Sequence, residues 1–312
     1  MGRWLEAIRS FLGASRSCAA PPELDLALVV GAQRSGTTWL QQLLGAHPRI
    51  VTGAESHLFS QYLFYPWSHW HTQEQMHKSG GRLVGLSCYV TLEEFEAILR
   101  SIAVQVLGRL LEGKPSARTI VEKTPDHALR LNFARTLFPK AKIIHILRDP
   151  RDVVASLLAA KAKAWGRTWA PADAQEAARR WVEYVSGARG ARQPEDLYAE
   201  VRYEDLLADA PREMGRLLAF LGAPADRDAV RDICARFSFE ACQEGTSPNV
   251  LVYCGQHSAP PPAEPEGFYR SGQAGGWQQT LSAEDLTAID EIAGPLMREV
   301  GYASSPSLVL AQ

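Results

Sequence analysis

The chain has 312 residues, in which 33 lysines and arginines nearly balance 35 aspartates and glutamates, for a formal net charge of −2. That balance argues against nucleic acid or an anionic membrane as a partner of the whole chain, so any anion site must be local. The five cysteines are odd in number and form no C-x-x-C pair, which favours a reducing compartment over a disulfide framework. No run approaches the roughly 20 apolar residues that span a bilayer, so we expect no transmembrane segment and a cytoplasmic protein.

Residues 1–23 form the first expected element, an amphipathic N-terminal extension. Its apolar side chains recur at helical spacing: Trp4, Leu5, Ile8, Phe11 and Leu12. Glu6 and Arg9 interrupt the apolar run, which makes it a poor signal peptide, and position 6 lacks the Ser or Thr of a myristoylation signal. We expect a short helix that packs on the domain or on a partner, with docking to a membrane surface as the alternative.

Four short apolar runs come next along the chain, and each precedes a helical pattern. They are LALVVGA, ARTIVEKTP, KIIHILRDP and LYAEVRYEDLL. Short buried strands that alternate with helices predict an α/β fold, with a P-loop-like central parallel β-sheet flanked by helices on both faces. We expect one domain over residues 24–304 and a tail over 305–312. Ligands of such sheets bind at the carboxyl ends of the strands, so all four strand exits are candidates for one shared site.

Two regions interrupt this alternation. Residues 56–90 are rich in aromatic residues and histidine without clean periodicity, and residues 244–280 are rich in Pro and Gly. Long irregular segments inside compact domains usually carry function or are disordered. We therefore expect 56–90 to be an irregular segment on the acceptor side of a site, and 244–280 to be a loop that closes over a ligand.

The first apolar run leads into GAQRSGTTW, which begins at Gly31. Its glycine spacing is that of a nucleotide-binding P-loop, but Thr37 stands where such loops carry a lysine. Backbone N–H groups, two hydroxyls and a helix N-terminus still make an anion site, to which Arg34 adds one positive charge. The loop therefore suits a single 5′-phosphate with a small group attached. The simpler alternative is a Gly–Thr helix start with an incidental arginine.

The stretch RSGTTW resembles the 5′-phosphosulfate loop of the sulfotransferase superfamily, whose members use 3′-phosphoadenosine 5′-phosphosulfate (PAPS). Its arginine is similar to that of the tyrosylprotein sulfotransferases and many bacterial members, whereas the cytosolic members carry lysine there. The resemblance implies that this loop binds the cofactor through Arg34, Ser35, Gly36, Thr37, Thr38 and Trp39.

A second segment, ILRDPRDVVAS, carries the same resemblance. Arg148 and Ser156 match the superfamily's 3′-phosphate site, and an arginine fork suits a phosphate monoester. Taken alone, Arg148 is better explained as one half of an Arg–Asp ion pair at a strand–helix junction. Tyr203, in YEDLL, matches a family tyrosine beside the adenine, although a tyrosine at a strand end is more often core packing.

A third segment, RSGQAGGWQ, is similar to the family's late loop that closes over the nucleotide. By this resemblance Arg270, Ser271 and Gly272 contact the 3′-phosphate side of the cofactor. Ser271 replaces a family lysine, which implies weaker nucleotide binding than in the cytosolic enzymes. The matches run in family order from about residue 24 to 302.

Sulfuryl transfer needs a base for the acceptor hydroxyl and a cation at the leaving phosphate oxygen. The cytosolic members place a histidine where this chain has Pro125, in VEKTPDH. Resemblance to the tyrosylprotein enzymes, and to heparan sulfate O-sulfotransferases with their Glu-x-His-x-Phe pattern, implies Glu55 as the base. It also implies Lys123 at the bridging oxygen, while His57 orients Glu55 or the acceptor.

Alternatives remain for each of these residues. Glu55 could be a loop carboxylate that only pairs with Arg34 or Lys123, and Lys123 could pair with the neighbouring Glu122. His127 is the reserve candidate for the base.

Other histidine and tryptophan side chains give weaker indications of function. His69, His71 and His77 lack the cysteine pair or H-E-x-x-H spacing of a zinc site, so we expect no metal. Three tryptophans after the phosphate-binding segment could wall an acceptor pocket or simply pack in the core: Trp165, Trp169 and Trp181.

Taken together, the sequence predicts a PAPS-dependent O-sulfotransferase acting on a small-molecule or glycan hydroxyl, with adenosine 3′,5′-bisphosphate (PAP) as a product. One alternative is a P-loop small-molecule kinase or NTPase, which would need the missing lysine and a magnesium-binding aspartate. Another is a non-catalytic relative that binds nucleotide and recruits a partner. The acceptor and the oligomeric state are left open.

Overall fold

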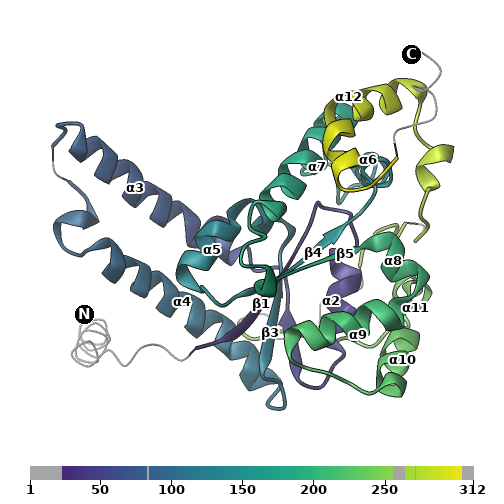
Figure 1. The fold of residues 1–312 in the computed structure, drawn as a ribbon, viewed down its shortest axis with the longest axis horizontal. Coiled ribbons are helices and arrows are strands. Elements are labelled where there is room, and N and C mark those ends of the chain that lie inside the picture. Colours follow the sequence, from purple (N-terminus) through teal and green to yellow (C-terminus); the bar gives the residue numbers. More distant parts are fainter. Residues whose placement is uncertain (1–22, 83, 256–263, 271, 304–312) are drawn as a thin grey trace.

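The computed structural model describes residues 23–82, 84–255, 264–270 and 272–303. The expected N-terminal extension over residues 1–23, apart from Glu23, lies outside these residues, as do the tail over 305–312 and Ser271. Within them the chain forms one six-stranded sheet in the order β5-β4-β1-β3-β2-β6 (Figure 1). Its strands are β1 (Asp25–Val30), β2 (Ile50–Gly53), β3 (Thr119–Lys123), β4 (Lys142–Leu147), β5 (Tyr198–Arg202) and β6 (Leu251–Val252).

Every strand pair in this sheet is parallel, which confirms the predicted fold class. β1 is central because it pairs with β3 on one side and with β4 on the other. The four predicted strands are present, but β2 and β6 were not anticipated. Since all strands point the same way, their carboxyl ends meet at one edge of the sheet.

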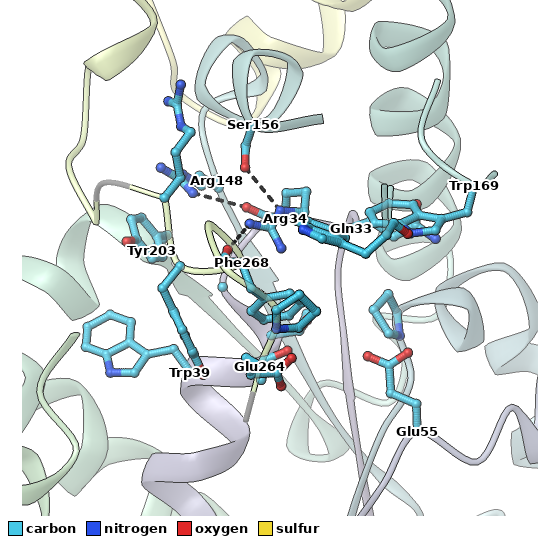
Figure 2. A pocket seen from close by; sticks show the side chains of 18 of the residues that line it. Gln33, Arg34, Trp39, Glu55, Arg148, Ser156, Trp169, Tyr203, Glu264 and Phe268 are labelled. Carbon is cyan, nitrogen blue, oxygen red and sulfur yellow. Dashed lines mark hydrogen bonds between the residues drawn. The ribbon is translucent and has the colours of Figure 1, made fainter. Parts of the chain in front are cut away.

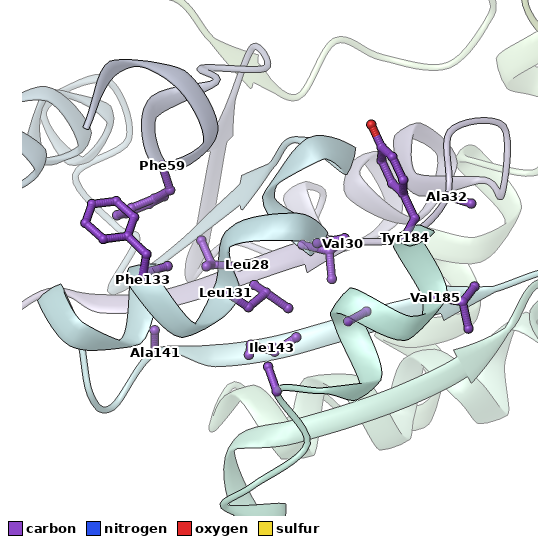
Figure 3. Close-up of a cluster of buried hydrophobic side chains, with 14 of the residues drawn as sticks. Leu28, Val30, Ala32, Phe59, Leu131, Phe133, Ala141, Ile143, Tyr184 and Val185 are labelled. Atoms are coloured by element: carbon purple, nitrogen blue, oxygen red, sulfur yellow. The ribbon is translucent and has the colours of Figure 1, made fainter. Parts of the chain in front are cut away.

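Helices cover both faces of the sheet, so β1 alternates between two cores. Leu26, Leu28 and Val30 point into one core, and Ala27 and Val29 into the other. The first core, part of which is shown in Figure 3, lies under α4 (Leu92–Gly113), α5 (Leu131–Leu137), α6 (Pro150–Lys161), α7 (Ala174–Arg189) and α12 (Ala283–Glu299). The second lies under α2 (Thr37–Gly45), α8 (Tyr203–Ala208), α9 (Ala210–Leu221), α10 (Arg227–Arg236) and α11 (Phe239–Gln243).

The expectation of an irregular segment over residues 56–90 is wrong. A π-helical turn (Leu58–Tyr62) leads into α3 (Phe64–Lys78), and a 3₁₀ turn (Leu86–Cys88) precedes α4. Trp70 is the one buried residue of α3, where it stacks on Phe95 of α4 with ring centroids 4.9 Å apart. Because α3 buries one residue instead of a stripe, its sequence carries no amphipathic period. Figure 1 shows α3 and α4 projecting together from the body of the molecule.

The segment after α11 matches its prediction better. Its described parts hold only the two-residue strand β6 and a 3₁₀ turn (Gly276–Gln279) before α12 begins. Residues 264–270 of this segment reach the carboxyl edge of the sheet, beside the loop after β1.

Candidate active site

The loop between β1 and α2 has the geometry of an anion site. Arg34 and Gly36 both adopt left-handed backbone conformations, with φ of 72° and 96°. Gly36 is the N-cap of α2, and no side chain caps it, so the first-turn N–H groups remain available to a ligand. A Cβ at Gly36 would lie 2.6 Å from Cδ2 of Tyr203, so glycine is required there by conformation and by space.

Arg34 connects this loop to two other segments. Its Nε donates to Ser156 Oγ at 3.1 Å, and its Nη2 donates to the backbone carbonyl of Phe268. The guanidinium also lies 4.8 Å from the ring centroid of Phe268 and 5.6 Å from that of Trp165. Burial, followed by the positive charges of Arg148 and Arg270, lowers the pKa of Arg34 to about 10. A group held under such repulsion gains from a bound anion.

Arg148 and Tyr203 form the second part of the site. The Arg148 guanidinium lies 4.1 Å from the centroid of the Tyr203 ring, and it donates to the carbonyls of Arg34 and Gln273, each at 3.1 Å. Among the described residues, four buried polar atoms at or beside the cavity lack a hydrogen-bond partner: Ser35 Oγ, His57 Nδ1, Arg148 Nε and Tyr203 Oη. Buried polar groups without partners are rare away from functional sites, so a polar ligand fits here.

The late loop, residues 270–278, is held against α6 by Asp152 of that helix. This fully buried carboxylate accepts from the backbone N–H of Gly275 at 2.7 Å and of Trp277 at 3.0 Å. A Cβ at Gly272 would lie 2.2 Å from the Phe239 ring, so the loop approaches α11 as closely as a glycine permits. These contacts place Arg270 and Gly272 at the cavity; Ser271 is not described.

Glu55 and Lys123 meet at the exits of two neighbouring strands. Lys123, whose side chain is 4% exposed, ends β3 and forms an ion pair with Glu55, which follows β2. Its Nζ also donates to Thr38 Oγ1 at 3.2 Å. The alternative partner for Lys123, the neighbouring Glu122, is wrong because Glu122 points to the opposite side and accepts from Ser56 and Thr124.

His57 lies between two carboxylates. Its Nε2 is 3.9 Å from Glu55 Oε2, and its Nδ1 is 3.6 Å from Asp126 Oδ2. Asp126 is held by Tyr184 and Gln33, which both donate to its Oδ1. The sequence analysis did not anticipate Asp126 or Gln33 in the site. Their positions in the sequence could have suggested a role in the site, because Asp126 directly follows the KTP turn and Gln33 lies inside the loop that begins at Gly31.

The structure contradicts His127 as a candidate base. Its side chain is fully buried, and its Nε2 lies 3.0 Å from Glu122 Oε2 beneath the site. The ring packs edge-on against Phe59, and His127 does not line the cavity. Although burial raises the pKa of Glu122, the charge and hydrogen bond of His127 outweigh it and lower this pKa to about 2. His127 therefore supports the loop under the site and cannot reach an acceptor.

These groups surround a single cavity of about 580 Å³ (Figure 2). Ser35 and Lys123 lie just behind its wall. The predicted residues that line it directly are Arg34, Gly36, Thr37, Thr38, Trp39, Glu55, His57, Arg148, Ser156, Tyr203, Arg270 and Gly272. Trp165 and Trp169 also line it, whereas Trp181 is buried in the core, where its Nε1 donates to the carbonyl of Arg148.

The described residues lack two kinds of feature. They contain no group of three or more His, Cys, Asp or Glu side chains arranged to hold a metal ion. In the same part of the chain, no helix combines the length and apolar character needed to cross a membrane.

Comparison with known proteins identifies the family. A model described as "Sulfotransferase family" matches residues 27–227, and the chain therefore belongs to this family. The expectation of a PAPS-dependent sulfotransferase is confirmed at this level.

Among curated relatives, a putative protein-tyrosine sulfotransferase of Caenorhabditis briggsae is 26% identical over 290 residues, which cover 91% of each chain. A protein-tyrosine sulfotransferase of Drosophila melanogaster is 26% identical over 204 residues, which cover 65% of this chain but only 39% of that protein.

Solved structures agree on the fold. The sulfotransferase domain from the curacin biosynthetic pathway superposes with a TM-score of 0.55 at 17% identity, over 91% of this chain and 99% of that domain. Mouse sulfotransferase SULT7A1, solved in complex with PAP, gives a TM-score of 0.52 at 15% identity, over 88% of this chain and 85% of that one.

Proposed function

We propose that this protein transfers the sulfuryl group of PAPS to a hydroxyl acceptor, with Glu55 as the general base. One observation carries the proposal: three arginines from separate segments and the Glu55–Lys123 ion pair line or adjoin the same cavity. Membership of the sulfotransferase family supports it. The three arginines, Arg34, Arg148 and Arg270, supply positive charge for the two phosphate-bearing ends of the donor.

In the proposed mechanism the loop after β1 holds the 5′-phosphosulfate through its backbone N–H groups and the Thr37 and Thr38 hydroxyls. Arg148, Ser156 and Arg270 hold the 3′-phosphate. Tyr203 presents its ring to the adenine. The Arg148 guanidinium packs against the same tyrosine ring.

Glu55 accepts the proton of the acceptor hydroxyl as that oxygen bonds to sulfur on the side opposite the phosphate. The sulfur–oxygen bond to the phosphate breaks, and Lys123 and Arg34 stabilise the negative charge that develops on the departing oxygen. His57, between Glu55 and Asp126, keeps the Glu55 carboxylate oriented toward the acceptor.

The residues of the site support a kinase less well than a sulfotransferase. Thr37 occupies the position of the lysine that reaches the β- and γ-phosphates. A kinase also has no use for a second arginine cluster at Arg148 and Arg270, whereas a nucleotide with a 3′-phosphate does.

The first test is calorimetric titration of the wild-type chain and of Arg148→Ala with PAP, and with ADP in the presence of magnesium. We expect micromolar PAP binding, much weaker ADP binding, and a loss of PAP affinity of about 10–100-fold in Arg148→Ala, as for a charged hydrogen bond. Arg179→Ala, on the exposed face of α7, is the matched control and should bind PAP like the wild type. Equal binding of both nucleotides, or a preference for ADP, would reject the proposal.

A cytoplasmic location and a metabolite or glycan acceptor are also part of this proposal. Cell fractionation of the producing organism tests the first, and a sulfate-transfer screen of hydroxyl compounds tests the second.

A further inference from the structure

The cavity carries opposite charges at its two ends. The arginines gather at one end, and the other end is lined by three carboxylates from separate segments: Glu55 after β2, Asp126 after β3 and Glu264 in the segment just before the late loop. Figure 2 shows Glu264 beside Phe268, on the side of the cavity where Glu55 lies. The apolar surfaces at this end come from Trp169, Pro125 and Pro265.

The three carboxylates differ in how their charge is balanced. Glu55 is paired with Lys123. Asp126 accepts only from the uncharged donors Gln33 and Tyr184, with His57 at 3.6 Å. Glu264 makes no hydrogen bond or ion pair with any other described residue. Two of the three negative charges therefore lack a permanent cationic partner in the part of the chain that the structure describes.

In the proposed function, the cations of the site bind the anionic groups of the donor. On the proposed function, Arg34, Arg148, Arg270 and Lys123 face the sulfate and the two phosphates of PAPS, which together neutralise them. Arg180, a further cation near this end, is already bonded to Gln33, Glu176 and the carbonyl of Trp169. With the donor bound, the acceptor end keeps a negative field.

The raised pKa of Glu264 is consistent with a negative field at this end of the cavity. Burial raises the pKa of its carboxyl, and the charge of Glu55 contributes in the same direction, against the opposing effects of Lys123 and Arg34. A carboxylate disfavoured in this way gains when a cation is placed against it.

Resting on the proposed function, we propose that the acceptor is a hydroxyl compound that also carries a protonated amine, and that Glu264 and Asp126 bind this ammonium group. Amino alcohols, amino sugars and amine-bearing phenols share this chemistry. Acceptors with a carboxylate or sulfate near the reacting hydroxyl are disfavoured, because like charges at this end repel them.

The test uses acceptors that differ in charge and little else. Tyramine, 4-ethylphenol and 4-hydroxyphenylacetate form one series, and glucosamine, glucose and glucuronate form another. Each compound is titrated by calorimetry into the enzyme saturated with PAP. We expect the cationic member of at least one series to bind about tenfold or more tightly than the neutral member, with no detectable binding of the anion. Equal binding within both series, tighter binding of an anion, or no cation binding at millimolar concentration would overturn the inference.

Variants of Glu264 assign the effect to that residue. Glu264→Gln should reduce the preference for the cation by about fivefold, as for one partly exposed charge pair, and Glu264→Lys should abolish or reverse it. The same substitutions at Glu266, an exposed residue of the same segment that does not line the cavity, should leave the preference unchanged. An unchanged preference in Glu264→Lys would also contradict the inference. PAP binding is measured first in each experiment, so failure of the donor site would reject the proposed function separately.

Discussion

Glu55 and Lys123 come from different strand exits and form an ion pair at the reacting end of the cavity. The lysine is buried and the glutamate is partly exposed, so the pair presents its carboxylate to the cavity and keeps its ammonium group near Thr38 in the loop region after β1. This arrangement lets one pair serve both ends of an in-line transfer. The pairing alone is also what a purely structural role would show, so kinetics must separate the two roles.

Glu55→Gln should lower kcat by about 10²–10⁴-fold, because the amide cannot accept the acceptor proton. PAP affinity should stay within about twofold of the wild type, since Glu55 does not contact the phosphates in our proposal. Stopped assays with labelled PAPS and calorimetry with PAP provide the two measurements. Glu112→Gln, an exposed position at the end of α4, is the control. Unchanged kcat in Glu55→Gln would assign Glu55 a structural role.

A second residue-scale prediction concerns Glu122, whose pKa is lowered from 4.5 to about 2 by His127 and by hydrogen bonds from Thr124 and Ser56. A carboxyl with a lower pKa in the folded state stabilises that state fully above the unfolded pKa. Its contribution is lost as the pH falls from about 4.5 toward 2. Glu122→Gln should therefore be less stable by about 1–3 kcal/mol near neutral pH. Its deficit relative to the wild type should shrink as the medium is acidified.

Urea unfolding of both proteins at several pH values between about 6 and 3.5 measures this difference, with Glu112→Gln as the control. A deficit that stays constant with pH would show that Glu122 keeps an ordinary pKa in the folded protein.

At the scale of elements, the late loop depends on α6. Asp152 binds two backbone N–H groups of this loop, and Arg151 lies 4.3 Å from the ring centroid of Trp277. The helix that carries Ser156 thus also positions the loop that carries Arg270. A change inside α6 should therefore reach the donor site through the loop.

Asp152→Asn replaces one of the two accepting oxygens by a donor, so one loop N–H loses its partner. We expect PAP affinity to fall about tenfold, in line with the cost of one unpaired buried donor. Asp226→Asn, at the N-cap of α10, is the control, because Asn caps helices as well as Asp. Calorimetry gives the affinity and thermal unfolding gives the stability of each variant. A stability loss in Asp152→Asn without any change in PAP affinity would contradict a positioning role.

At the scale of the whole molecule, the donor cavity joins segments from both halves of the chain, from the loop after β1 to residue Gly272. A ligand bound there should stabilise the entire fold. PAP at about 100 times its Kd adds about 2.7 kcal/mol, which corresponds to a rise in Tm of about 3–5 °C for a domain of this size. Scanning calorimetry of the wild type and Arg148→Ala at equal PAP concentration checks this, and an equal rise in both would place the nucleotide elsewhere.

The sequence predicted much of this fold because buried parallel strands are continuous apolar runs. It missed β2 and β6, since four and two residues carry too little pattern, and their pairing with β3 and with each other decides their conformation. It missed α3 because that helix buries only Trp70.

The residues of the site likewise fall into those that the sequence predicted and those that it missed. Arg34, Arg148 and Arg270 sit in recognisable motifs, and the structure places them around one cavity. Asp126 lies in a 3₁₀ turn (Pro125–Arg130) and Glu264 in an irregular segment, and tertiary contacts bring both side chains to the cavity, so only the place of Asp126 after the KTP turn could have marked it. His127 was a plausible base from its residue type and its position in the sequence. Its burial against Glu122 depends on tertiary packing, which the sequence pattern does not show.

The central place of β1 has a consequence for how the chain folds. Asp25 lies opposite Thr119 in the sheet, a partner 94 residues later in the sequence, and the neighbour on the other side, β4, is later still. β1, which is apolar on both faces, therefore has no strand partner until β3 and β4 have been synthesised, when nearly half of the 312 residues exist. Such distant pairing slows folding and exposes strand edges to aggregation. Refolding from denaturant should accordingly be slow and sensitive to protein concentration, and N-terminal fragments that end before β3 should not fold alone.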